Sequence, residues 1–154
     1  LGGGPFVHAP ALVTWGGRSM TVLAVSSGGE LLARQWNGST WSAWANLGGT
    51  LASRVHVAST GKDSFRVFAR GSDGRIQTRA WSGTAWDAWS AIGPETFLGE
   101  PAVASFRGGY LSLCATSTTD HVLLNLWDGS AWSGWQDMGG NLRANPALFR
   151  WIAG

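Results

Sequence analysis

The sequence predicts an all-β fold of β-propeller blades, each a sheet of four antiparallel strands, with about three blades in the chain. A cassette W-x-G-x-x-W-x-x-W begins at Trp36, Trp81 and Trp127, so the chain repeats itself at spacings of 45 and 46 residues. Within each repeat, short apolar runs alternate with glycine-containing turns such as Asp73-Gly74 and Asp128-Gly129. Four short strands in a repeat of this length are typical of a propeller blade.

The elements follow in the same order in every repeat. We expect the first strand at 10–15, 55–60 and 101–106, the second at 20–27, 65–72 and 111–117, and the third at 30–36, 75–81 and 121–127. The fourth strand is expected to carry the second and third tryptophans of each cassette. The whole chain is then one repeat domain, with repeats over about 1–46, 47–91 and 92–137 and a partial repeat over 138–154 that supplies an extra first strand at 146–151.

The second and third strands indicate how the blades are arranged. Residues 20–25 are apolar on both alternating faces, as expected for a sheet packed between two neighbours. In the third strand, Arg34, Arg79 and Asn125 each lie two residues before a cassette tryptophan and therefore share its face, a pattern typical of a groove. The next two tryptophans are three residues apart, which in a regular strand predicts opposite faces. One ring of each pair would then pack on its own blade while the other reaches the neighbour.

The repeat S-x-D-G-x-I-x-x-R-x-W-x-G-x-x-W-x-x-W-x-x-I-G, clearest over 72–93, resembles that of the Photorhabdus-type (PLL-like) bacterial propeller lectins, which bind fucose and O-methylated sugars. The resemblance covers all three repeats and implies shallow sugar sites between adjacent blades. Arg34 and Arg79 match the basic position of that family, whereas Asn125 departs from it, so the third groove is expected to be weaker or differently selective. The implied sugar-binding residues are Trp36, Trp41, Trp44, Trp81, Trp86, Trp89, Trp127, Trp132, Trp135, Arg34, Arg79 and Asn125.

Elementary chemistry agrees with a sugar site. An indole offers a flat polarisable face to the C–H groups of a pyranose, and deoxy or methylated sugars present more apolar surface to it. Nearby polar groups would then fix the hydroxyls. One shallow site is expected to bind with a dissociation constant on the order of 1 μM to 1 mM. Several sites on one ring would strengthen attachment to a multivalent surface by roughly 10² to 10⁴.

Other interpretations of the same residues stay open. The cassette tryptophans could only cement neighbouring blades, and Arg34 and Arg79 could pair with Asp73, Asp87 or Asp128. Trp15 and Trp151 are expected in the core or at a blade seam, and the sequence Asn37-Gly38-Ser39 is expected to form a hairpin turn rather than a glycan acceptor. A non-catalytic scaffold that binds a protein partner is the alternative function. An enzyme is not expected, because no pair of acids or Ser, His and Asp set recurs with the repeat.

Composition narrows the partners. The formal charge is +2 and the arginines are scattered, which disfavours nucleic acid, and no apolar run of about 18 residues predicts membrane insertion. No cofactor or metal is expected, and Cys114, the single cysteine, is expected to be a small buried hydrophobe. No signal peptide is visible, although a leader could have been removed. Cellular location therefore stays open between secretion and the cytoplasm, with a bacterial source and extracellular glycans as targets.

The number of repeats poses a structural question. Closed propellers usually have four to eight blades, so three blades would leave apolar sheet faces uncovered. We expect two identical chains to close one ring of about six blades with two-fold symmetry. The extra first strand does not fit simply into such a ring. A hybrid blade or a longer natural chain is the alternative.

Overall fold

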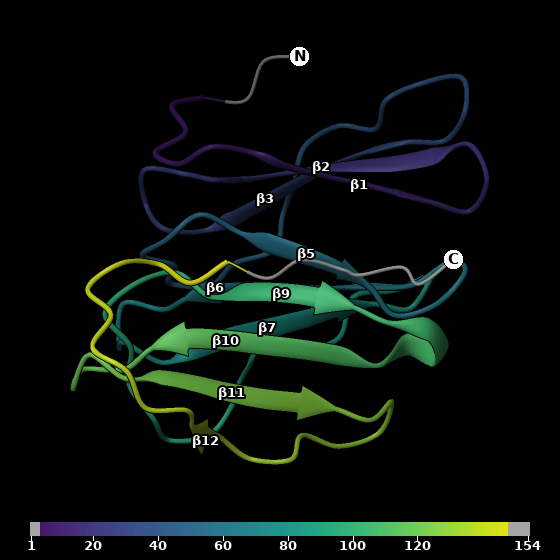
Figure 1. The fold of residues 1–154 in the computed structure, drawn as a ribbon. Coiled ribbons are helices and arrows are strands. Elements are labelled where there is room, and N and C mark those ends of the chain that lie inside the picture. Colours follow the sequence, from purple (N-terminus) through teal and green to yellow (C-terminus); the bar gives the residue numbers. More distant parts are fainter. Residues whose placement is uncertain (1–3, 148–154) are drawn as a thin grey trace.

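The computed structural model describes residues 4–147, and these form three four-stranded antiparallel sheets stacked in chain order (Figure 1). Blade 1 contains β1 (Ala11–Trp15), β2 (Ser19–Val25), β3 (Leu31–Trp36) and β4 (Ala45–Asn46). Blade 2 contains β5 (His56–Ser59), β6 (Phe65–Arg70), β7 (Ile76–Trp81) and β8 (Ser90–Ala91). Blade 3 contains β9 (Ala102–Ser105), β10 (Leu111–Thr116), β11 (Val122–Trp127) and β12 (Gln136–Asp137). A single 3₁₀ turn, Arg107–Gly109, separates β9 from β10.

Within each blade the strands lie side by side in the order of the sequence. The predicted first, second and third strands are therefore confirmed in all three blades, with ends that differ by one or two residues. The expected extra first strand at 146–151, together with Trp151, falls almost wholly outside the described residues. No helix in the described part of the chain is long and apolar enough to cross a membrane.

The fourth strands are shorter than predicted, because each begins only after the third tryptophan of the cassette. The second tryptophan forms an isolated bridge to the first, as between Trp81 and Trp86. The side chain of the residue after the second tryptophan then accepts a backbone hydrogen bond from the third strand, in place of the backbone carbonyl of a regular ladder. In blade 2 the Asp87 carboxylate accepts a hydrogen bond from the backbone N–H of Ala80, and Ser42 and Ser133 do the same for the matching residues of blades 1 and 3. The strand pairing is interrupted there and resumes three residues later, at Ser90 in blade 2.

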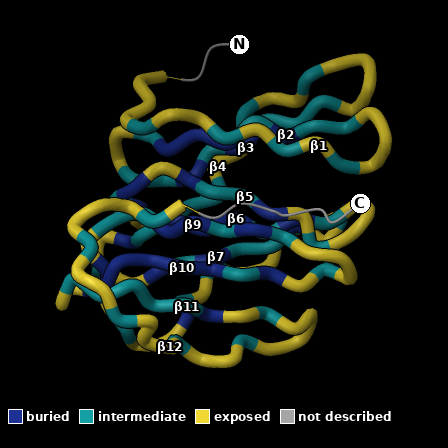
Figure 2. The backbone as a smooth tube through the Cα atoms, viewed as in Figure 1, coloured by how far each residue is buried: buried dark blue, intermediate teal, exposed yellow. Residues whose placement is uncertain are grey.

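The core lies between the blades. At the first junction, Leu23 and Val25 of blade 1 pack in one cluster with Phe65 and Val67 of blade 2. At the second junction, Phe68 and Ile76 of blade 2 pack with apolar residues of β10. Blade 2 is consequently buried on both faces, whereas the exposed residues lie mainly in the hairpins and on the outer blades (Figure 2). Trp15 packs into the first junction, as expected, and Cys114 is buried, with its thiol pKa raised to about 11 by that burial.

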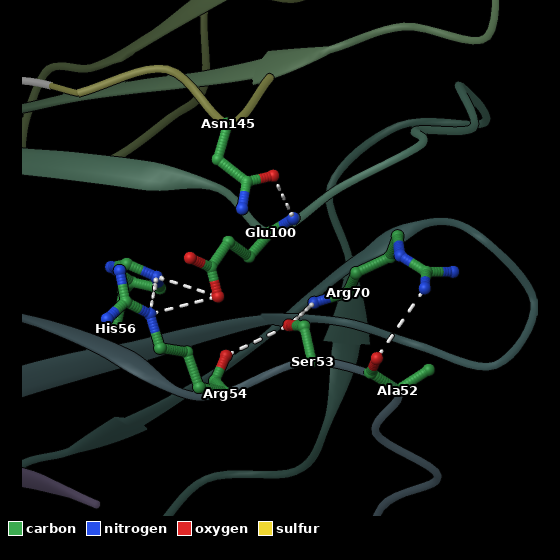
Figure 3. Close-up of polar contacts among 7 residues, drawn as sticks. All are labelled: Ala52, Ser53, Arg54, His56, Arg70, Glu100 and Asn145. Atoms are coloured by element: carbon green, nitrogen blue, oxygen red, sulfur yellow. Dashed lines mark hydrogen bonds and ion pairs between the residues drawn. The ribbon is translucent and has the colours of Figure 1, made fainter. Parts of the chain in front are cut away.

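The same backbone hydrogen bond recurs where the chain leaves each blade. The N–H of Leu51 donates to the carbonyl of Gly29, that of Phe97 to Gly74, and that of Leu142 to Asp120. Beside these crossings, Arg54 forms an ion pair with Glu100 of the following blade, at 2.9 Å, and His56 lies against the same carboxylate (Figure 3). Neighbouring blades are thus joined by polar contacts at this end as well as by their apolar faces.

Candidate functional site: grooves between adjacent blades

The three predicted sets of groove residues lie on the same face of their blades, and in blades 2 and 3 this face points toward the preceding blade. The set with Arg79 and Trp81 belongs to the junction between blades 1 and 2, and the set with Asn125 and Trp127 to the junction between blades 2 and 3. The set with Arg34 and Trp36 lies on the face of blade 1 that points away from blade 2, because Leu31 and Ala33 occupy the alternate positions that face blade 2. The structure therefore brings two of the three sets together with a preceding blade.

The tryptophans of each cassette divide into a contacting pair and a bridging ring. The first two rings pack against each other at a tilt, with centroids 5.5 Å apart for Trp81 and Trp86 and 5.3 Å apart for Trp127 and Trp132. The third ring reaches the preceding blade, where the Trp89 indole N–H donates to the carbonyl of Leu47 at 2.9 Å. In the same way, Trp135 donates to the carbonyl of Ile92 at 2.8 Å.

This division of roles was expected, but the reason given for it is wrong. Trp86 and Trp89 both pack into the cluster between blades 1 and 2, so they do not point to opposite faces. The alternation rule fails because the chain leaves the regular ladder at Asp87, between the two rings. Sequence spacing alone could not show that interruption.

Two glycines allow the bridging rings to lie against the preceding blade. Gly49 has φ of 97°, and a Cβ at this position would lie 3.2 Å from the Trp89 ring. Gly93 has φ of 75°, and a Cβ there would lie 3.1 Å from the Trp135 ring. Any other residue would be strained in this backbone conformation and would also push the indole away from the carbonyl that it contacts.

The two junctions differ at the polar position of the third strand. Arg79 donates from Nε to the carbonyl of Asp87 and from Nη1 to the carbonyl of Leu47, so its guanidinium crosses from blade 2 to blade 1. These bonds go to backbone oxygens. The pairing of Arg79 with an aspartate carboxylate that the sequence left open is not seen, because Asp73 binds Arg75 and the Asp87 carboxylate binds Ala80.

Asn125 is shorter than arginine and leaves space at the second junction. Its side-chain oxygen accepts a hydrogen bond from the Ser133 hydroxyl at 3.3 Å, within its own blade. A cavity of about 280 Å³ lies beside it, lined by residues 91–95 of blade 2 and by Asn125, Trp132, Gly134 and Trp135 of blade 3. The cavity has two aromatic walls and a few polar groups, which is the usual composition of a site for a small organic ligand.

Glu95 is a lining residue that the sequence analysis did not identify. Its Oε2 atom is buried and has no hydrogen-bond donor within the described residues. A buried carboxylate oxygen without a donor is costly, and a bound hydroxyl group would supply one. The only sequence signal is its position, two residues after Gly93 in the segment that passes beneath Trp135.

A second cavity of about 280 Å³ lies at the same junction and is lined by Thr60, Ser64, Arg66, Trp127 and three glycines. The Arg66 guanidinium lies 4.8 Å from the Trp127 ring centroid, and burial lowers the pKa of Arg66. In the first junction the matching space is filled by Trp15, whose ring packs at a tilt against Trp81 with centroids 5.6 Å apart, whereas blade 2 has Thr60 at that position. Arg66 was also missed, although an arginine within the otherwise apolar run 65–69 was a usable signal.

Within residues 4–147, no group of three or more His, Cys, Asp or Glu side chains is placed to hold a metal ion. Asn37 closes its hairpin by accepting hydrogen bonds from the backbone N–H groups of Ser39 and Thr40, at 3.0 and 2.9 Å. Its predicted role as a turn residue is thereby confirmed.

Comparison with known proteins places this geometry in a wider set of structures. No protein family profile matches the sequence, and no curated protein matches it. Among solved structures, the BP39L lectin from Burkholderia pseudomallei superimposes with a TM-score of 0.75 and 18% sequence identity over 89% of this chain and 43% of that one. The chain has a β-propeller fold. The Aleuria aurantia lectin, solved with α-methyl-L-fucoside, superimposes with a TM-score of 0.69 and 19% identity over 88% of this chain and 48% of that one. The chain thus spans less than half the length of each of these two lectins.

A third solved structure is a fucose lectin from Kordia zhangzhouensis in complex with methyl-fucoside. It has a TM-score of 0.63 and 19% identity, and the match covers 86% of this chain and 100% of that one. At these identities the likeness establishes the propeller fold. The predicted propeller is therefore confirmed, and membership of the Photorhabdus-type lectins stays a prediction.

Proposed function

We propose that this protein is a lectin that binds sugars in tryptophan-walled grooves between adjacent blades, and that fucose or another deoxy or O-methylated sugar is the ligand. The observation that carries the proposal is the cavity at the junction of blades 2 and 3. Its walls are the rings of Trp132 and Trp135, and its polar groups are Asn125 and Glu95. Propellers with the same fold are lectins, two of them solved with fucosides, and this supports the choice of ligand.

The geometry suggests how a sugar would be held. A pyranose ring has an apolar face of C–H groups that can lie on an indole, and a 6-deoxy or O-methyl group adds further apolar surface. Glu95 lines the cavity, and its carboxylate would accept a hydrogen bond from one sugar hydroxyl. The Asn125 amide would contact a second hydroxyl. Nothing in this arrangement calls for catalysis, and binding without reaction is part of the proposal.

The two junctions would then differ in strength. At the first junction, Arg79 donates one hydrogen bond to a backbone carbonyl of blade 2 and one to a backbone carbonyl of blade 1, so it helps to hold the groove closed. At the second junction the matching Asn125 leaves the cavity open. We therefore propose the opposite order from the one expected from the sequence, with the Asn125 groove as the stronger site.

The second cavity, beside Arg66, is a candidate for the same function. Its guanidinium lies on the Trp127 ring and its lining includes the hydroxyl groups of Thr60 and Ser64, so it offers both donors and an aromatic surface. The proposal also includes self-association, because Leu12 of blade 1 and Phe106 of blade 3 are exposed apolar side chains on the outer sheet faces. A second copy would complete the ring and multiply the sites, which strengthens binding to a multivalent glycan surface.

The test is a calorimetric titration of the chain with L-fucose and with a methyl fucoside. We expect saturable binding with a dissociation constant on the order of 1 μM to 1 mM. The variant Glu95→Gln keeps the shape of the side chain and should weaken one class of sites at least about tenfold, since it replaces a charged acceptor. Glu30→Gln is the matched control, because Glu30 is hydrogen-bonded within blade 1 to Ser26 and Asn46. The Glu30→Gln variant should bind sugar like the native chain.

Two results would overturn the proposal. One is the absence of saturable binding to either fucoside and to a wider panel of monosaccharides, which would favour a propeller scaffold for a protein partner. The other is equal binding by the native chain and by Glu95→Gln at every site, which would remove the cavity beside Trp135 from the list of sugar sites.

A further inference from the structure

An arginine at the junction of blades 2 and 3 has a neutral counterpart at the first junction. Arg66 lies on β6, opposite Ala58 and Ala80 in the register, on the face that points toward blade 3. The matching residue of blade 1 is Thr21, which is fully buried and accepts a hydrogen bond from the Trp15 indole N–H at 2.9 Å. The first junction therefore closes at this place with two neutral side chains that bind each other.

The second junction replaces both members of that pair. Thr60 takes the position of Trp15, and Arg66 takes the position of Thr21. A bulky indole is thus replaced by a small hydroxyl side chain, and a neutral residue is replaced by a cation. The cavity of about 280 Å³ at this place is lined by Thr60, Ser64, Arg66, Trp127 and three glycines. The space that an indole fills in the first junction is therefore open in the second, with a positive charge in its wall.

The guanidinium of Arg66 has unused hydrogen-bond donors. Within residues 4–147 its side chain forms no hydrogen bond and no ion pair, and its Nε atom is buried. The Trp127 ring lies beside it, with the ring centroid 4.8 Å from the guanidinium carbon. An aromatic face interacts with the charge but offers no acceptor to the N–H groups, which lie in the guanidinium plane. Contact with Trp127 therefore leaves the donors of Arg66 for another partner.

The charge of Arg66 is also not balanced by nearby acids. Burial lowers the pKa of its guanidinium, and the Asp87 carboxylate, which acts in the opposite direction, does not outweigh that effect. The Asp87 carboxylate itself accepts the backbone N–H of Ala80. Asp128, next to the lining residue Gly129, uses its carboxylate to close its own turn. Arginine keeps its proton at neutral pH, so a half-buried positive charge faces the cavity.

We infer that this cavity binds a carboxylate group, held by the guanidinium of Arg66 and the hydroxyl groups of Thr60 and Ser64. A guanidinium donates two parallel N–H groups to a carboxylate, and such charge-assisted hydrogen bonds are about twice as strong as neutral ones. The Thr60 hydroxyl donates to that of Ser64 at 3.1 Å, so the Ser64 hydroxyl can donate its own proton to a ligand. The ligand is therefore a small hydroxylated acid, either free or as an acidic sugar.

This inference goes beyond the proposed function, because a fucoside carries no charge. It stands whether or not the groove beside Asn125 binds a neutral sugar. The two cavities share the junction of blades 2 and 3, but their linings differ in charge. Glu95 lines the cavity beside Asn125, whereas Arg66 lines this one. They are thus expected to select different ligands.

The charge of the lining favours a ligand with a single negative charge. Among the described residues that line the cavity, only Arg66 is charged. A carboxylate carries one negative charge, which this cation balances. A phosphate monoester carries about −1.5 to −2 at neutral pH and would retain an excess charge in a half-buried site. A sulfate ester also carries one charge, so inorganic sulfate is the competitor that tests the choice of a carboxylate.

The glycines of the lining keep the protein itself from filling the cavity. Gly109 has φ of 81°, and a Cβ at this position would lie 2.5 Å from the carbonyl oxygen of Thr60. Any other residue would therefore be strained there and would collide with the backbone of blade 2. This part of the wall consequently carries no side chain that could take the place of the ligand beside Arg66.

Calorimetric titration with D-glucuronate tests the site, with D-glucose as the matching ring that lacks the carboxylate. We expect saturable binding of D-glucuronate with a dissociation constant on the order of 1 mM. D-Glucose should bind at least about tenfold more weakly, because the charge-assisted hydrogen bonds are lost. Equal binding of the two would overturn the inference. Sodium sulfate that displaces D-glucuronate at an equal or lower concentration would overturn the choice of a carboxylate.

Titration with L-lactate distinguishes the two sources of the carboxylate. Lactate is a hydroxy acid without a sugar ring. Binding of both lactate and D-glucuronate would uphold the site and assign it to small hydroxy acids. Binding of D-glucuronate without lactate would also uphold the site and assign it to acidic sugars.

Two variants of Arg66 locate the binding. Arg66→Gln should weaken D-glucuronate binding at least about tenfold, because it removes the charge. Arg75→Gln is the matched control, since it removes the same charge from an exposed ion pair with Asp73 in the same blade and should bind like the native chain. The double variant Thr60→Trp with Arg66→Thr copies the Trp15 and Thr21 pair of the first junction. It should fold, as circular dichroism would show, and lose D-glucuronate binding.

The variants also separate this inference from the proposed function. Native binding of D-glucuronate by Arg66→Gln, or by the folded double variant, would place the ligand elsewhere and overturn the inference. A native chain that binds D-glucuronate but no fucoside would uphold the carboxylate site and refute the proposed function. A chain that binds a fucoside but not D-glucuronate or lactate would have the opposite meaning.

Discussion

Trp81 and Trp89 contribute to the same blade junction in different ways, and replacing each by phenylalanine should separate the two. Trp81 is only 9% exposed, but its indole N–H is buried and finds no acceptor within the described residues. Trp89 is more exposed, but its N–H donates to the carbonyl of Leu47 at 2.9 Å. The more deeply buried ring is therefore expected to be the less costly one to replace.

The magnitudes follow from these contacts. A buried indole that shrinks to a phenyl ring loses about 1–2 kcal/mol of packing. Trp81→Phe also removes an unsatisfied buried donor, which returns about 1–3 kcal/mol, so its net cost should be near zero. Trp89→Phe loses a hydrogen bond worth about 0.5–1.5 kcal/mol in addition to packing. Arg79 also donates to the carbonyl of Leu47, so this oxygen keeps a partner and no further penalty is added.

Thermal unfolding followed by circular dichroism measures the difference. A gap of about 2 kcal/mol corresponds to a melting temperature about 4–8 °C lower for Trp89→Phe than for Trp81→Phe in a chain of this size. Urea unfolding of both variants at one temperature provides an independent value of the same free-energy difference. If Trp81→Phe proves the less stable of the two, the assignment of these hydrogen-bond states is wrong.

Three further predictions concern titration and turn chemistry. Burial and the neighbouring Arg54 hold the pKa of His56 below its usual value near 6.5, so the unfolded chain binds a proton more readily. Stability should fall as pH drops below about 6.5, and urea midpoints of His56→Gln should fall less. Cys114, with a thiol pKa of about 11, should react slowly with a disulfide reagent at pH 8 in the native chain and rapidly in denaturant. Asp128 accepts hydrogen bonds from Ser130 and Ala131, so Asp128→Ala should lower the melting temperature while Asp128→Asn retains it.

The repeat made the blades predictable because one signal recurred three times. The first three strands of each blade are regular. Alternation therefore correctly placed Arg79 with Trp81, and Asn125 with Trp127, on one face of the sheet, and this face points toward the preceding blade. The interruption before the third tryptophan was not predictable from spacing. It depends on a side-chain oxygen, from Asp87 in blade 2, that replaces a backbone acceptor in the ladder.

The openness of each junction was also beyond the sequence analysis. Whether a cavity exists beside Arg66 depends on Thr60, which is contributed by another strand and matches the bulky Trp15 of blade 1. Whether the groove beside Trp89 is crossed depends on where the Arg79 guanidinium ends, on a carbonyl of blade 1. Both are contacts between strands that periodicity does not relate. For the same reason Glu95 was missed as a lining residue.

A cassette tryptophan can pack between two blades and also form the wall of a groove. Trp89 and Trp135 each donate the indole N–H to the preceding blade, which fixes the plane of the ring. A ring fixed in this way loses little conformational freedom when a flat apolar ligand lies on it. Packing between blades therefore prepares the wall of a groove, and the residue at the adjacent polar position decides whether the groove stays open. Arg79 and Asn125 represent the two outcomes on otherwise matching backbones.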